Sequence, residues 1–71
     1  MSDVVIGNLA VVRVWCQLWD HSRVYGPRIT NIEADTLVLI IAMNDNEAFV
    51  YVSSLNKVGW LYLMWLNTVP Q

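Results

Sequence analysis

The most regular feature of the chain is a series of short runs in which apolar residues alternate, separated by polar turns. In residues 9–16 the even-numbered positions carry small apolar side chains, whereas the odd-numbered positions include Arg13 and Trp15. A period of two is typical of a half-buried β-strand. We therefore expect a first strand over residues 9–16, with its even positions facing the core. These positions are Ala10, Val12, Val14 and Cys16.

Residues 17–31 interrupt the alternation. The segments Asp20-His21-Ser22 and Tyr25-Gly26-Pro27 are rich in turn-forming residues. Proline also disfavours helical geometry in the residue before it. The pattern predicts a long excursion, with a short ribbon at residues 22–25. Long ordered loops often carry function.

Residues 32–35 predict a tight reversal, and residues 36–42 predict a second strand with two apolar faces. One face of an antiparallel sheet is normally polar, and a chain of 71 residues has little to cover a second apolar face. A neighbouring subunit would cover it. We expect Val38 and Ile40 to face that subunit, while Leu37 and Leu39 face the core.

The remaining residues continue the strand pattern. An acidic turn at 43–47 precedes a third strand at 48–53, and a turn at 54–57 leads to a fourth strand at 58–61. One helical turn at 62–65 and a last strand at 66–69 complete a small all-β fold of five strands. Gly59 is expected to allow a sharp or positive-φ backbone. The expected core residues are Val12, Val14, Ile32, Leu37, Leu39, Val52, Leu61 and Leu66.

Three stretches together resemble the SH3-like barrel family, and the bacterial SH3 type most closely. These are residues 32–40 with the acidic turn after them, Phe49-Val50-Tyr51-Val52, and Gly59-Trp60-Leu61 followed by Trp65-Leu66. In that family a long loop follows the first strand, and a Gly-Trp-aliphatic strand leads into one helical turn. The resemblance implies a five-stranded SH3-like barrel, with residues 1–8 as a lead-in and residues 9–69 as the barrel of a single domain spanning 1–71.

The resemblance also implies a ligand groove between the long loop and the acidic turn. Asp20, Asp45 and Glu47 lie in the segments that would flank it, and they suit a proline-rich or basic peptide. Tyr62 stands where peptide-binding members of the family have proline, which favours contact with another subunit instead. The groove candidates are Trp19, Tyr25, Phe49, Tyr62 and Trp65.

Composition supports an interacting protein. Apolar residues make up 56% of the chain and charged residues 14%, above and below the usual values, so part of the apolar surface should lie outside the core. Exposed apolar surface usually marks an interface. Four basic residues and a net charge of −2 are too little positive charge for nucleic-acid binding. No apolar run reaches the roughly 20 residues that span a membrane, so we expect a soluble, cytoplasmic protein.

No arrangement of residues indicates catalysis. Cys16 is the only cysteine, which leaves no disulfide within the chain, and it lies in an apolar run typical of an inert core thiol. His21 has no third group to form a catalytic set with Cys16. We expect no enzyme activity, no metal site and no cofactor.

Two functions remain open on the sequence. The first is an interaction or assembly module that forms a homo-oligomer through Trp15, Val38 and Ile40. The alternative is a monomeric domain that binds peptides or cell-wall fragments through the aromatic groove. By analogy, small proteins of this kind are typical of phages and bacteria.

Overall fold

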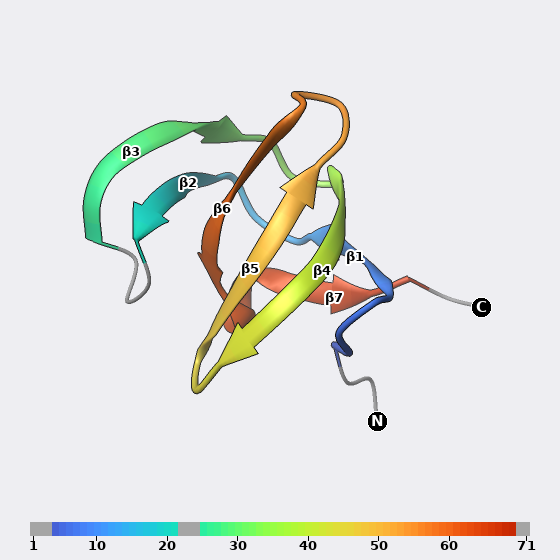
Figure 1. Cartoon of the computed structure of the whole chain (residues 1–71). Helices are drawn as coiled ribbons and strands as arrows, with labels where there is room; N and C mark the ends of the chain where they lie inside the picture. The colour runs from blue at the N-terminus through green and yellow to red at the C-terminus, as the bar shows by residue number, and fades with distance from the viewer. Residues whose placement is uncertain (1–3, 22–24, 70–71) are drawn as a thin grey trace.

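The structure is a computed structural model that describes residues 4–21 and 25–69. These residues form one antiparallel sheet of seven strands and a short 3-10 helix (Figure 1). The strands follow the order β3-β2-β6-β5-β4-β1-β7 across the sheet. The elements are β1 (Leu9–Val12), β2 (Cys16–His21), β3 (Tyr25–Ile32), β4 (Leu37–Asn44), β5 (Glu47–Val52), β6 (Lys57–Tyr62), η1 (Leu63–Trp65) and β7 (Leu66–Thr68).

The expected all-β class is confirmed, but the sheet differs from the expected five-stranded barrel. It has seven strands, and its edge strands β3 and β7 are not paired with each other among the described residues. The sheet is strongly curved, and the β2–β3 hairpin extends to one side of it (Figure 1). No helix in the described part of the chain is long and apolar enough to cross a membrane.

Strands β4, β5 and β6 form a meander, and the turn before it and the two turns within it contain residues that suit the backbone. Asp35, Asp45 and Asn56 adopt positive φ angles of 70°, 47° and 53° in three successive turns. Asp and Asn tolerate this region better than other non-glycine residues. The Tyr51 hydroxyl group also donates a hydrogen bond to Asn56 Oδ1 at 3.0 Å. The turns predicted at residues 32–35, 43–47 and 54–57 are therefore confirmed.

The predicted excursion over residues 17–31 is wrong. This segment forms the β2–β3 hairpin, with register shifts on either side of Trp19. The Gly26-Pro27 step lies within β3, where the pattern predicted a turn. Proline lacks the N–H group that a central strand needs, but an edge strand tolerates it. The ribbon predicted at residues 22–25 falls mostly outside the described residues.

The first strand is shorter than predicted. β1 ends at Val12, and the chain bends before β2 begins at Cys16. The Arg13 N–H group donates to the Trp65 carbonyl oxygen at 2.8 Å, which anchors the bend to η1. The alternation therefore does not continue through Val14, which is 42% exposed rather than in the core.

A further correction concerns β4, whose buried and exposed faces are reversed relative to the prediction. Val38 and Ile40 are each 1% exposed, so they lie in the core of a single chain and are not available to a neighbouring subunit. Leu37 and Leu39 are exposed instead. The pairing of β4 with β1 determines which face of β4 is buried. Val38 lies opposite Ala10 of β1, and Ala10 is a core residue. The core consists of Ala10, Val12, Cys16, Leu18, Ile32, Val38, Ile40, Ala48, Val50, Val52, Leu61 and Leu66.

Gly59 is required for close packing rather than for a special backbone angle. Its φ lies outside the positive region, and it is buried in β6. A Cβ atom at this position would lie 2.5 Å from Leu18 Cγ and 2.8 Å from the Trp19 carbonyl oxygen. Both atoms belong to β2, so β6 packs closely against β2 at Gly59.

The substitution Gly59→Ala tests this approach. The added methyl group cannot be accommodated unless β2 moves away from β6, and overpacking of this kind costs about 1–3 kcal/mol. Urea unfolding should show a loss of this size. Ser54→Ala in the exposed β5–β6 turn is the control and should change stability by less than about 0.5 kcal/mol. Equal stability of the Gly59→Ala variant and the original protein would contradict the inferred packing.

Candidate functional site

A row of apolar side chains crosses the outer surface of the sheet. Leu9 lies opposite Leu39, Leu39 opposite Tyr51, and Tyr51 opposite Val58. The row therefore spans β1, β4, β5 and β6, at roughly 4.8 Å per strand. Leu37 extends it along β4. We call these five residues the outer apolar face.

None of the five side chains carries a charge, and four of them are exposed, with Leu39 at 37%. Single exposed apolar residues are normal on a protein surface, but a contiguous group is typical of an interface. Trp15 is 58% exposed, as expected for an interface residue, but it lies in the bend after β1 and outside this row.

Aromatic residues from three neighbouring strands meet beside this face. Trp19 of β2 lies opposite Trp60 of β6, and Trp60 lies opposite Phe49 of β5. The Phe49 and Trp60 ring centroids are 5.2 Å apart. The Arg28 guanidinium group lies 5.9 Å from the Trp19 ring centroid, within the range of a cation–π contact. Two groove candidates, Trp19 and Phe49, therefore lie on either side of Trp60 in neighbouring strands.

Two other groove candidates form a second pair. Tyr62 and Trp65 pack edge to face, with centroids 4.8 Å apart. Trp65 also packs against the core, so its ring supports η1 as well as lining a surface. Tyr25 begins β3, and its side chain lies outside the described part of the structure.

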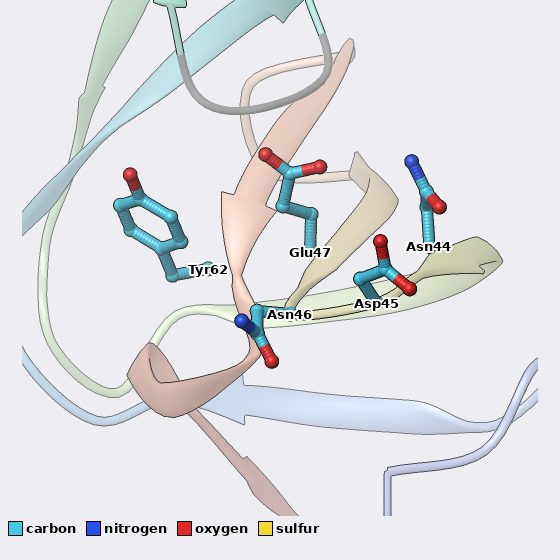
Figure 2. A pocket seen from close by; sticks show the side chains of 5 residues that line it. All are labelled: Asn44, Asp45, Asn46, Glu47 and Tyr62. Atoms are coloured by element: carbon cyan, nitrogen blue, oxygen red, sulfur yellow. The ribbon is translucent and has the colours of Figure 1, made fainter.

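A hollow of about 370 Å³ lies at the β4–β5 turn, beside Tyr62 (Figure 2). It is lined by Asn44, Asp45, Asn46, Glu47 and Tyr62. Glu47 and Tyr62 lie directly opposite each other on β5 and β6, and Figure 2 shows their side chains projecting to the same side. A second hollow, of about 340 Å³, shares Asn46 and Tyr62 and continues to Leu63 and Met64.

A backbone hydrogen bond connects two elements that line these hollows, the β4–β5 turn and η1. The Leu63 N–H group donates to the Asn46 carbonyl oxygen at 2.7 Å, which ties η1 to the β4–β5 turn. The turn and the helix are therefore held together, although they are separated by β5 and β6 in the sequence. The predicted proximity of Tyr62 to the acidic turn agrees with this arrangement.

Sequence reasoning missed several residues of these surfaces. The alternation predicts Leu9 and Val58 only as strand positions, yet they complete the outer apolar face. The sequence predicts Asn44 and Asn46 only as turn residues, yet they line the hollow. The alternation of β5 and β6 carries a usable signal, because Tyr51 faces outward when Val50 faces inward, and Val58 faces outward when Leu61 faces inward.

The described residues contain no group of three or more His, Cys, Asp or Glu side chains that could hold a metal ion. Cys16 is buried, and burial raises the pKa of its thiol to about 11. The thiolate is the reactive form of cysteine. The structure therefore places Cys16 among core residues and away from both hollows.

The comparisons with known proteins give no match for this chain, whether with protein-family models, curated proteins or solved structures. Its fold and its candidate sites are therefore described from its own residues.

The reactivity of Cys16 provides a test of its environment. A pKa near 11 instead of the ordinary 9.0 lowers the thiolate fraction at pH 8 about a hundredfold. Labelling by a disulfide reagent should be slower in the folded protein by at least this factor, and it should accelerate with rising pH until the pH approaches 11. The same chain in concentrated guanidinium chloride is the control. Equal labelling rates in the folded and unfolded chains would contradict the buried placement.

Proposed function

We propose that this protein is a non-enzymatic interaction module that self-associates through the outer apolar face. The row Leu9, Leu39, Tyr51 and Val58 carries the proposal, because it crosses four adjacent strands without a charged residue. The interface residues proposed here on β4 differ from those that the sequence predicted. Val38 and Ile40 lie in the core, and their neighbours Leu37 and Leu39 take their place.

A second copy of the chain is the occupant that this face fits best. An uncharged apolar surface is complementary to itself, since no charge on one copy needs an opposite charge on the other. In a twofold arrangement the same patch on both copies forms the interface, and each contact between different residues occurs twice. A stable interface takes about 800 Å² from each partner, about a sixth of the 4603 Å² surface of this chain.

We further propose that the sheet is of the SH3-like type. A long hairpin follows the first strand, Phe49 lies near the start of β5, and Gly59-Trp60-Leu61 leads into η1 and β7. Phe49 and the Gly59-Trp60-Leu61 segment match the residues on which the resemblance rests, and the β2–β3 hairpin occupies the place where the family has a long loop. A module of this kind acts by binding, which agrees with a surface made of aromatic and aliphatic side chains.

The substitution Leu39→Lys tests the self-association. It places a charge at the centre of the row, and burying an unpaired charge costs several kcal/mol. Light scattering and sedimentation should give the original protein a mass of twice 8.2 kDa. The variant should be monomeric, with a dissociation constant raised at least about a hundredfold.

Met64→Lys is the matched control. Met64 is 69% exposed and lies in η1, outside the outer apolar face, so the variant gains the same charge on an apolar surface position. It should keep the mass of the original protein. A strictly monomeric original protein at millimolar concentration, or equal effects of both variants, would refute self-association through this face.

A monomeric peptide- or cell-wall-binding domain is the second candidate. The aromatic pairs Phe49–Trp60 and Tyr62–Trp65 favour it, because they provide rigid apolar surface near the β4–β5 turn. Titration with proline-rich peptides and cell-wall fragments, followed by tryptophan fluorescence, distinguishes it from the first. A response from a monomeric protein would favour this candidate, and the absence of any response would remove it.

A further inference from the structure

The hollow at the β4–β5 turn is lined by a carboxylate whose residue is otherwise buried. Glu47 is 5% exposed, yet it lines the hollow together with Asp45 and Tyr62. Figure 2 shows the Glu47 carboxylate extending between the Tyr62 ring and the side chains of Asn44 and Asp45. Among the described residues, it has no hydrogen-bond or ion-pair partner.

The carboxylate end of Glu47 reaches the hollow, because among the described residues the one buried side-chain nitrogen or oxygen without a partner is Trp19 Nε1. A carboxylate in this position can accept hydrogen bonds from a molecule that enters the 370 Å³ hollow. Two basic residues of the described part of the chain lie elsewhere. Arg13 donates to the Met64 carbonyl oxygen, and Arg28 lies over Trp19.

We propose that this hollow binds an organic cation, an alkylammonium or guanidinium group supplied by a partner molecule. Glu47 would accept hydrogen bonds from the cation, and Asp45 would add a second negative charge at the rim. The Tyr62 ring would provide an aromatic wall, which attracts cations through its π-electrons. The side-chain carbonyl oxygens of Asn44 and Asn46 would accept any remaining N–H groups.

The same residues favour an organic cation over a metal ion. Of the described residues that line the hollow, two carry carboxylates, whereas calcium takes six to eight oxygen ligands in close coordination. An aromatic wall contributes nothing to calcium coordination but does contribute to binding ammonium and guanidinium groups. A volume near 370 Å³ also falls within the range of small-molecule sites.

The inference is independent of self-association. Glu47 and Tyr62 lie at the end of the β5–β6 pair near η1, whereas Tyr51 and Val58 of the outer apolar face lie toward its other end. Loss of one surface should therefore leave the other intact.

The test uses arginine and lysine derivatives with blocked termini, titrated into the full chain and followed by amide and aromatic NMR shifts. Both should shift the signals of Glu47, Asn46 and Tyr62, and added sodium chloride should weaken the effect. The relative affinity of the two derivatives identifies guanidinium or ammonium as the preferred group. Blocked citrulline, which has nearly the shape of arginine without its charge, should produce no shift.

The variant Glu47→Gln keeps the size of the side chain and removes its charge. It should weaken binding of both cations at least about tenfold, because the charge that strengthens the hydrogen bonds to the cation is lost. Glu33→Gln is the matched control, because it makes the same change in an exposed residue of the β3–β4 turn, at the opposite end of β4. It should bind as the original protein does.

Several results would overturn the proposal. They are the absence of any shift with both cations, an equal response to citrulline, unchanged binding by Glu47→Gln, or stronger binding of calcium than of either organic cation. A basic residue of the chain that already occupied the hollow would prevent both cations from shifting the signals.

Thermal unfolding of Glu47→Gln shows whether the variant is folded. Asp45→Asn, at the exposed rim, is a second variant that should also weaken binding of both cations. Leu39→Lys should retain the response, which separates failure here from failure of self-association.

Discussion

The close approach of β2 to β6 at Gly59 is the constraint on which the rest of this small sheet depends. Among the described residues, Trp19 and Trp60 are the one pair that lies in register between these strands, whereas the other neighbouring strands share several pairs. Leu18 fills the core at this point, and only a residue without a side chain can face it. This contact joins the β2–β3 hairpin to the central meander and brings Trp19 beside Trp60 and Phe49.

The small size of the chain explains its surface. A domain of 71 residues buries a modest fraction of its surface, and the core here consists mainly of Val, Leu, Ile and Ala. Part of the apolar excess lies on the outer apolar face, and the rest is spread over the segment before β1, the bend after β1, the second half of β4, the β5–β6 turn and η1. The two candidate surfaces therefore use different chemistry. One is uncharged and wide, and the other is a hollow that combines two carboxylates with an aromatic ring.

Several features could be predicted from local patterns. The strands over β5 and β6, the helical turn before β7 and the turns at Asp35, Asp45 and Asn56 agree with expectation. The β2–β3 hairpin could not be predicted in this way, because Gly26-Pro27 has the composition of a turn. Its position at the sheet edge, where proline costs no ladder hydrogen bond, depends on strands far along the sequence.

The sequence by itself determined the all-β class, the turn positions and the excess of apolar residues over the core. These properties follow from alternation and from the backbone preferences of Asp, Asn and Gly, which act over a few neighbouring residues. The tertiary structure alone decided which face of β4 is buried. Leu37 and Leu39 are as apolar as Val38 and Ile40, so local pattern cannot separate them. The strand register distinguishes the two pairs, because Val38 lies opposite Ala10 and Ile40 lies opposite Val50. A shift of one residue in this register would exchange the buried and exposed faces of β4.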